Sequence, residues 1–146
     1  MRQAGLSDIA AVTALVNAAY GHYVQRIGMI PGPMTRDYQE VIGDRNVTVA
    51  ERGGEVVAVI VLHVTDEGFG IDNVAVHPSC QGQGLGRALL NLAETRAREA
   101  GFGSVYLYTH EKMTENLDLY AKIGYVEYRR SAHDGFALVH MRKHLG

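Results

Sequence analysis

Apolar residues recur at helical spacing in the first part of the chain. Over residues 7–20 they fall three or four positions apart, which predicts an amphipathic helix. Ser7 precedes this pattern, and its hydroxyl is suited to accept a free backbone N–H of the first turn. A second, short helix is predicted after Thr35 and ends near Gly43. The periodic positions of the first helix are Ile9, Val12, Leu15, Val16 and Ala19.

Residues 84–100 carry the clearest helical pattern of the sequence. Glu94 and Arg98 are spaced to pair at i,i+4 on its polar face, and Gly101 supplies the stop signal. A shorter helix is predicted over residues 114–123. The apolar face of the long helix consists of Leu85, Ala88, Leu89 and Leu92.

The remaining apolar runs are β-branched or aromatic and are bounded by turn residues, which is typical of strands. Gly53 and Gly54 between the first two runs predict a hairpin. Helices and strands do not alternate regularly along the chain. We therefore expect an α/β (α+β) fold with a mixed, mostly antiparallel central sheet of about six to seven strands flanked by helices. The predicted strands cover residues 47–51, 56–63, 69–77, 104–109, 125–130 and 136–141.

Composition is that of an ordinary globular chain. The 146 residues are 47% apolar and 21% charged, so we expect one domain over residues 1–146. The 14 basic and 16 acidic residues leave no basic excess for a nucleic-acid surface. Cys80 is the single cysteine, so no internal disulfide can form. Neither a signal-peptide nor a membrane-span pattern is found, and we expect a cytoplasmic protein.

A glycine-rich turn follows the strand predicted over residues 69–77. Its sequence is Gln81-Gly82-Gln83-Gly84-Leu85-Gly86-Arg87, and it opens the long helix. A helix start carries unpaired backbone N–H groups and partial positive charge, which favour an anion. Glycines let phosphate oxygens approach the backbone, and Arg87 adds a charged donor. The turn therefore predicts a site for a pyrophosphate.

Other interpretations of the turn are open at this point. A plain strand-to-helix connection with glycines for tight packing gives the same letters. A P-loop requires Gly-Lys followed by Ser or Thr, which the chain lacks. The dinucleotide fingerprint requires a last glycine or alanine where this chain has Arg87 or Leu89. Both nucleotide motifs therefore fit poorly.

Two motifs resemble those of the GNAT N-acetyltransferases. Gln81-x-x-Gly84-x-Gly86 is similar to the family motif Gln/Arg-x-x-Gly-x-Gly/Ala, and Val74-Ala75-Val76-His77-Pro78 is similar to the strand that precedes it. Further along, Leu119-Tyr120-Ala121-Lys122-Ile123-Gly124-Tyr125 resembles the family signature Leu-Tyr-x-x-x-Gly-Phe/Tyr. The order of elements agrees over nearly the whole chain. The resemblance therefore implies a GNAT-like acyl-CoA N-acyltransferase fold.

The resemblance also implies an activity: transfer of an acetyl group from acetyl-CoA directly to a primary amine of a small molecule or peptide, with no metal. The backbone of the strand before the turn would pair with the pantetheine arm, in a gap between splayed strands that end at His77 and Thr109. One N–H of that strand would donate to the developing oxyanion. Tyr120 would face the coenzyme sulfur and protonate the leaving thiolate. The implied coenzyme-binding residues are Val74, Ala75, Val76, Gln81, Gly82, Gln83, Gly84, Leu85, Gly86, Arg87 and Asn116.

The chain departs from the family pattern at two positions. Tyr108 stands where many members carry a glutamate base, so that base is absent. Met113 stands where many members have an asparagine that binds the coenzyme arm; Asn116, one turn later, is a replacement or simply a capping or exposed residue. Waters or prior deprotonation in bulk solvent are alternatives to a protein base. The titratable substitutes near the predicted cleft are Asp72, His77, His110 and Glu111.

The acceptor side of the predicted fold lies under the first helices. Aromatic and basic residues there would suit an acceptor with an apolar part and a carboxylate. The closing hairpin would complete the acceptor pocket or form a homodimer contact. The candidate lining is Tyr20, His22, Tyr23, Arg26 and the loop over residues 30–34, and the hairpin residues are Arg129, Arg130, His133 and Asp134.

Two further functions stay open on the sequence alone. The missing glutamate is consistent with a catalytically weak acyl-CoA-binding or sensor module. A nucleotide-binding regulatory domain is a third interpretation of the glycine turn. These differ in ligand, because the first binds acetyl-CoA without turnover and the second binds ATP.

Overall fold

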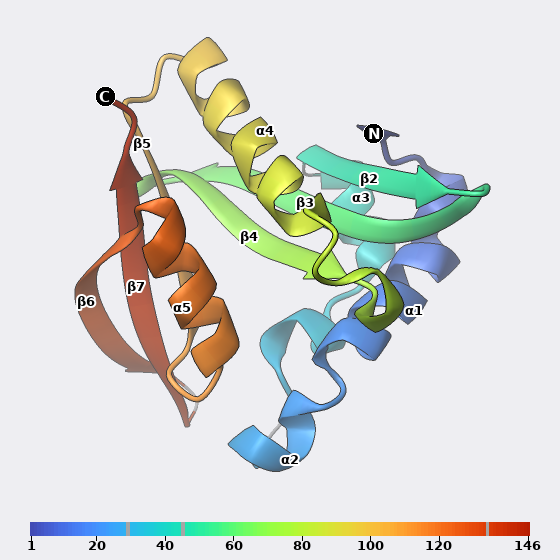
Figure 1. The fold of residues 1–146 in the computed structure, drawn as a ribbon, viewed down its shortest axis with the longest axis horizontal. Helices are drawn as coiled ribbons and strands as arrows, with labels where there is room; N and C mark the ends of the chain where they lie inside the picture. Colours follow the sequence, from blue (N-terminus) through green and yellow to red (C-terminus); the bar gives the residue numbers. More distant parts are fainter. Residues whose placement is uncertain (29, 45, 134) are drawn as a thin grey trace. The chain divides into compact units, whose positions relative to one another are not determined.

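The computed structural model describes residues 1–28, 30–44, 46–133 and 135–146 (Figure 1). Three short 3₁₀ turns, η1 (Leu6–Asp8), η2 (Gly32–Thr35) and η3 (Pro78–Cys80), join the main elements. The helices are α1 (Ile9–Tyr20), α2 (Tyr23–Ile27), α3 (Tyr38–Asp44), α4 (Leu85–Glu99) and α5 (Thr114–Ile123). The strands are β1 (Arg2–Gln3), β2 (Asn46–Arg52), β3 (Glu55–Thr65), β4 (Gly68–Val76), β5 (Ser104–His110), β6 (Val126–His133) and β7 (Phe136–His144).

The strands form one seven-stranded sheet in the order β1-β2-β3-β4-β5-β7-β6. β1 with β2, β2 with β3, β5 with β7 and β6 with β7 pair antiparallel, whereas β4 and β5 pair in parallel. The predicted mixed, mostly antiparallel sheet is therefore confirmed. The sequence pattern missed β1 and α2, which are too short for periodicity to reveal them.

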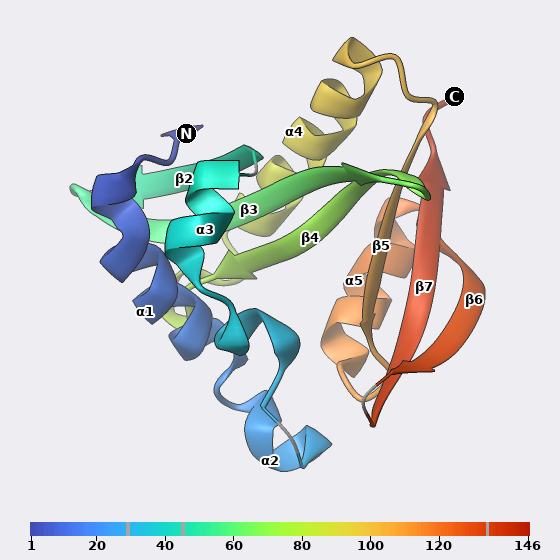
Figure 2. The same ribbon diagram turned by 180° about the vertical axis from the view of Figure 1, so that it is seen from behind.

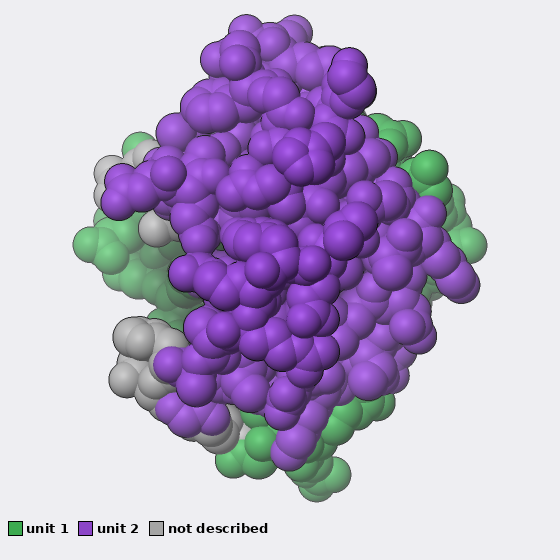
Figure 3. All heavy atoms as spheres, turned by 90° about the vertical axis from the view of Figure 1, so that its left-hand side faces the viewer, with its two compact units in different colours: residues 1–63, 72–92 green, residues 64–71, 93–146 purple. Residues whose placement is uncertain are grey.

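By its internal contacts the chain divides into two compact units (Figure 3). Unit 1 comprises Met1–His63 and Asp72–Leu92, and unit 2 comprises Val64–Ile71 and Ala93–Gly146. The boundary runs through β3, β4 and α4, so these three elements contribute to both units.

Unit 1 is built on β2 and β3, whose central residues are almost all buried. Its hairpin turns at the predicted glycine pair, with Arg52 paired to Glu55. Figures 1 and 2 show α1 and α3 over one face of these strands and the first half of α4 over the other. Burial of strands on both faces explains why their sequence is a continuous apolar run rather than an alternating one.

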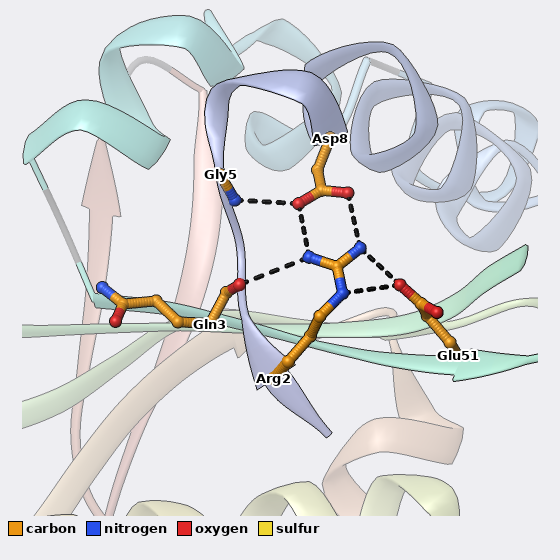
Figure 4. A network of polar contacts seen from close by, with 5 residues as sticks. All are labelled: Arg2, Gln3, Gly5, Asp8 and Glu51. Atoms are coloured by element: carbon orange, nitrogen blue, oxygen red, sulfur yellow. Dashed lines mark hydrogen bonds and ion pairs between the residues drawn. The ribbon is translucent and has the colours of Figure 1, made fainter. Parts of the chain in front are cut away.

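The start of unit 1 is fixed by the guanidinium of Arg2 (Figure 4). It donates to both carboxylate oxygens of Asp8, each at 2.8 Å, and its Nε lies 2.6 Å from Glu51 Oε1. Asp8 Oδ2 also accepts the N–H of Gly5 at 2.8 Å. The predicted helix cap at Ser7 is wrong, because Ser7 lies inside η1 and α1 begins at Ile9. The carboxylate of Asp8 orders this turn.

Unit 2 contains the three-stranded antiparallel arrangement β5-β7-β6, with α5 over one face (Figure 1). Gly70 of β4 pairs with Tyr106 of β5, and a Cβ at Gly70 would lie 2.6 Å from the Tyr106 ring. The predicted pair of Glu94 with Arg98 is not the contact that forms. The Glu94 carboxylate lies 3.0 Å from Nζ of Lys143, because Glu94 is on the buried side of α4.

Candidate functional site

The glycine turn joins the end of β4 to the start of α4, as its sequence predicts. β4 ends at Val76, η3 follows, and Gly82 and Gly84 have φ of 79° and 85° before α4 begins at Leu85. L-residues rarely adopt these angles, so glycine is required for the path of the chain. A Cβ built at either glycine would meet no atom within 4 Å. The glycines therefore do not serve tight packing, and the space before the turn is open.

The start of α4 leaves its backbone donors without protein partners. The N–H of Ala88 donates to Gly84 C=O at 3.0 Å, so the N–H groups of Gly84, Leu85, Gly86 and Arg87 precede the helical ladder. In the part of the chain that the structure describes, no acceptor is found for these four groups. Arg87 is exposed on the same turn. Four donors at the positive end of a helix of 15 residues are suited to bind an anion.

The end of β4 in unit 1 has backbone groups directed to both of its edges. The N–H of His77 donates to Val57 C=O on β3 at 2.8 Å. Backbone groups of alternate residues in a strand point to the same edge, so those of Val74 and Val76 point away from β3. Gln81 Nε2 donates to Val76 C=O at 3.3 Å, which holds the start of the turn against the strand end.

A buried hydrogen-bond network reaches the same stretch of β4 from α1 and α3. Tyr20 Oη lies 2.8 Å from Asn73 Oδ1 and 3.0 Å from Val74 O. Asn73 Nδ2 donates to Tyr38 Oη at 3.1 Å, and Tyr38 donates to Pro33 C=O at 2.7 Å. Neither Asn73 nor Tyr38 was among the residues predicted from the sequence to contribute to the site. The available signal was an amide inside an apolar strand, since a buried amide needs bonding partners.

The candidate bases of unit 1 are already engaged. The Asp72 carboxylate is 2% exposed, and its Oδ1 lies 3.2 Å from Nη2 of Arg36. His77 Nδ1 accepts the N–H of Ser79 at 3.1 Å, so in the neutral ring the proton is on Nε2. Both candidate bases therefore already have protein partners.

The candidate bases of unit 2 are His110 and Glu111. His110 is 7% exposed, and burial lowers its pKa below the ordinary 6.5. Its Nδ1 accepts the N–H of Lys112 at 3.1 Å, which again leaves the proton on Nε2. Glu111 is exposed, with its carboxylate 3.5 Å from Nη1 of Arg130. Tyr108, at the position of the absent glutamate, is 39% exposed.

Tyr120 and Asn116 both lie on α5 in unit 2. The Tyr120 side chain is 6% exposed, and its ring meets that of Tyr125 edge-on with centroids 5.9 Å apart. Asn116 is half-buried, and its Nδ2 lies 3.8 Å from Sδ of Met113. Met113 Sδ also accepts the hydroxyl of Thr109 at 3.3 Å. The asparagine is therefore turned toward the methionine that occupies the family position.

The acceptor-side residues on α2 and directly before it pack together. The ring centroids of His22, which precedes α2, and Tyr23 lie 3.9 Å apart with the rings tilted by 39°, and the guanidinium of Arg26 lies 5.1 Å from the centroid of the Tyr23 ring. Tyr20, on α1, is committed to the buried network described above. Of the hairpin residues, Asp134 lies outside the described part of the chain.

Comparison with known proteins decides the family. A sequence profile of the Acetyltransferase (GNAT) family matches residues 11–125, which include the glycine turn, α4 and the motif around Tyr120. The chain belongs to the GNAT acetyltransferase family. Both motifs on which the resemblance rested therefore lie inside the matched region.

Curated relatives of this GNAT chain match it over only part of its length. A mycothiol acetyltransferase from Thermomonospora curvata is 35% identical over 81 residues, which are 55% of this chain and 27% of that protein. An IAA acetyltransferase from Azospirillum brasilense is 33% identical over 86 residues, which are 58% of this chain and 56% of that protein. The chain thus spans about half or less of the length of the curated relatives it matches.

Solved structures agree with the GNAT fold. The PaiA N-acetyltransferase of Thermoplasma acidophilum, determined in complex with coenzyme A, superimposes with a TM-score of 0.79 at 16% identity, covering 98% of this chain and 96% of that one. Among the described residues, no helix is long and apolar enough to cross a membrane. Those residues also contain no group of three or more His, Cys, Asp or Glu side chains placed to hold a metal.

Proposed function

We propose that this GNAT chain is an acetyl-CoA-dependent N-acetyltransferase that acts on a primary amine of a small molecule or peptide. The observation that carries the proposal is the set of four N–H groups, from Gly84 to Arg87, without protein acceptors at the start of α4. A coenzyme A diphosphate supplies the oxygens that such donors require. Family membership supports the same ligand.

The residues of unit 1 fit the coenzyme in charge and shape. The diphosphate would lie against the turn, where Gly82 and Gly84 leave open space and Arg87 adds a cation. The pantetheine arm would run along the edge of β4 that carries the backbone groups of Val74 and Val76. Bound acetyl-CoA supplies an activated thioester, and every other task falls to this chain and to solvent.

The acceptor amine has to be neutral to attack the thioester carbonyl. For a lysine-like amine of pKa ~10.4, deprotonation at pH 7 costs roughly 4.6 kcal/mol. In His77 and His110 the unprotonated ring nitrogen, Nδ1, already accepts a backbone N–H, and Asp72 is ion-paired. We therefore assign removal of the amine proton to solvent rather than to a protein base. Log kcat/KM would then rise with pH with unit slope up to the pKa of the amine.

Two further groups complete the proposed chemistry. A backbone N–H of residues 74–76 would donate to the oxyanion as it develops. Tyr120 would protonate the leaving thiolate, a role assigned from its place in the family signature. We further propose that the protein acts in the cytoplasm, that it does not bind nucleic acid, and that any partner copy forms a homodimer.

The experiment begins with thermal shift. Acetyl-CoA should raise Tm by more than ATP does, because ATP carries phosphates but no pantetheine arm. Protection by ATP alone would instead support a nucleotide-binding domain.

A thiol-release assay over an amine panel then tests turnover. Tyr120→Phe should lower kcat about a hundredfold or more, within the range of proton-transfer contributions. Tyr125→Phe is the matched control, because it removes the hydroxyl of the neighbouring buried tyrosine and should keep wild-type turnover. Tight coenzyme binding without turnover of any amine would favour the sensor interpretation and refute the enzyme.

A further inference from the structure

The network behind β4 has a fixed direction, which follows from its donors and acceptors. Pro33 C=O only accepts, so the Tyr38 hydroxyl must donate to it at 2.7 Å. Tyr38 Oη must then accept from Asn73 Nδ2, at 3.1 Å. This places Asn73 Oδ1 toward Tyr20, and the Tyr20 hydroxyl has to donate. The direction of every hydrogen bond in the network therefore follows from Pro33 C=O, which can only accept.

The single proton of the Tyr20 hydroxyl is shared between two acceptors, Asn73 Oδ1 at 2.8 Å and Val74 C=O at 3.0 Å. Tyr20 is 8% exposed and Asn73 is 4% exposed, so water does not compete for these bonds. The chain of bonds thus ends on the backbone of β4. It ends on a residue whose polar groups point away from β3.

The second residue with this orientation is held in the same way. Val76 C=O accepts from Gln81 Nε2 at 3.3 Å. Side chains of this protein therefore occupy the carbonyls of both Val74 and Val76, while the N–H groups of the two residues point to the same edge. This edge of β4 is prepared to donate hydrogen bonds to an incoming extended ligand.

We propose that Tyr20 is a positioning residue, which holds the backbone of β4 at Val74 through its C=O so that the N–H of the same residue, on the same edge of the strand, is aimed at the pantetheine arm of the coenzyme. The inference rests on the proposed function, because it needs a coenzyme bound along β4. It goes further in separating two parts of the ligand site. The turn binds the diphosphate independently of Tyr20, and the strand binds pantetheine more tightly when Tyr20 holds it.

Two ligands separate these parts by calorimetry. Acetyl-CoA carries both the diphosphate and pantetheine, whereas 3′-phospho-ADP is the nucleotide half of the coenzyme and carries the diphosphate without pantetheine. Tyr20→Phe should weaken acetyl-CoA binding by about three- to tenfold, the value of one neutral hydrogen bond, and should leave 3′-phospho-ADP binding within about twofold of wild type. A general loss of structure would weaken both ligands together.

Tyr38→Phe is the matched control. It removes a buried hydroxyl from the same network, but one that does not touch the β4 backbone. Its Tm should fall about as far as that of Tyr20→Phe, with acetyl-CoA affinity kept within about twofold of wild type. The same amide of Val74 can be followed by NMR, where only Tyr20→Phe should shift its resonance strongly in the free protein.

The other possible results would overturn either the positioning role of Tyr20 or the proposed function. Equal losses of acetyl-CoA affinity in the two variants, or equal losses for both ligands in Tyr20→Phe, would overturn the positioning role. Wild-type protein that binds 3′-phospho-ADP as tightly as acetyl-CoA would also overturn it, since pantetheine would then gain nothing from β4. Wild-type protein that binds neither ligand would remove the proposed function itself.

Discussion

The assignment of the glycine turn to the diphosphate of the coenzyme can be tested with two glycines that flank the same helix. Gly84 precedes α4 with φ of 85°, and Gly101 follows it with φ of 86°. A Cβ at either position would meet no atom within 4 Å. Alanine therefore imposes the same backbone strain at both ends of the helix and no clash at either. The two variants differ only in what lies in front of the new methyl group.

Both alanine variants should lose the same small amount of stability. A left-handed conformation costs a non-glycine residue about 1–2 kcal/mol, and alanine recovers about 0.4–1 kcal/mol by restricting the unfolded chain. The net loss is about 1 kcal/mol, which corresponds to a fall in Tm of about 2–4 °C for a chain of this size. Both Gly84→Ala and Gly101→Ala should show it in a thermal melt without ligand.

Only Gly84→Ala should lose coenzyme. A hydrogen bond to a charged group is worth about 1.5–3 kcal/mol, and a methyl group at Gly84 would keep a phosphate away from the N–H groups behind it. Losing one such bond raises Kd for coenzyme A about tenfold or more, measured by calorimetry. Equal coenzyme affinity in the two variants would refute the assignment of this turn to the diphosphate.

Three further predictions concern stability. The Tyr125 hydroxyl is buried and has no hydrogen-bond partner among the described residues, so Tyr125→Phe should raise Tm by about 2–4 °C, and a lower Tm would reveal a partner. Gly70→Ala should cost about 1–3 kcal/mol in urea unfolding through its clash with the Tyr106 ring, and Tyr106→Leu in the same chain should recover part of the loss; additive losses would contradict the clash. The hydrogen bonds from Arg2, followed by the Gly5 N–H, lower the pKa of Asp8 from 3.8 to about 2. This stabilisation is full above about pH 4 and is lost as pH falls toward 2, so the Tm gap between wild type and Asp8→Asn should close over that interval. A gap that is constant from pH 7 to pH 2 would exclude the ion pair as its source.

The limits of sequence reasoning are clearest on α4. Its periodic positions predicted a buried face of Leu85, Ala88, Leu89 and Leu92, but the fully buried residues are Leu89, Leu90, Ala93 and Ala97. The helical period was predicted correctly, but the buried face lies around the helix from the predicted one, because periodicity contains no information on which elements cover a helix. For the same reason Glu94 was assigned to the polar side and is in fact 8% exposed beside Lys143.

Local conformation is what the sequence determined by itself. The strand, the glycine turn and the helix that follows depend on backbone sterics over short distances, so the turn and the unpaired N–H groups at the start of α4 were predictable from adjacent residues. The network from Tyr20 through Asn73 to Tyr38 joins residues far apart in the chain. Only tertiary packing brings them together, because a buried hydroxyl or amide takes whichever partner the fold places beside it. The positions that hold the β4 backbone were therefore decided by the folded structure alone.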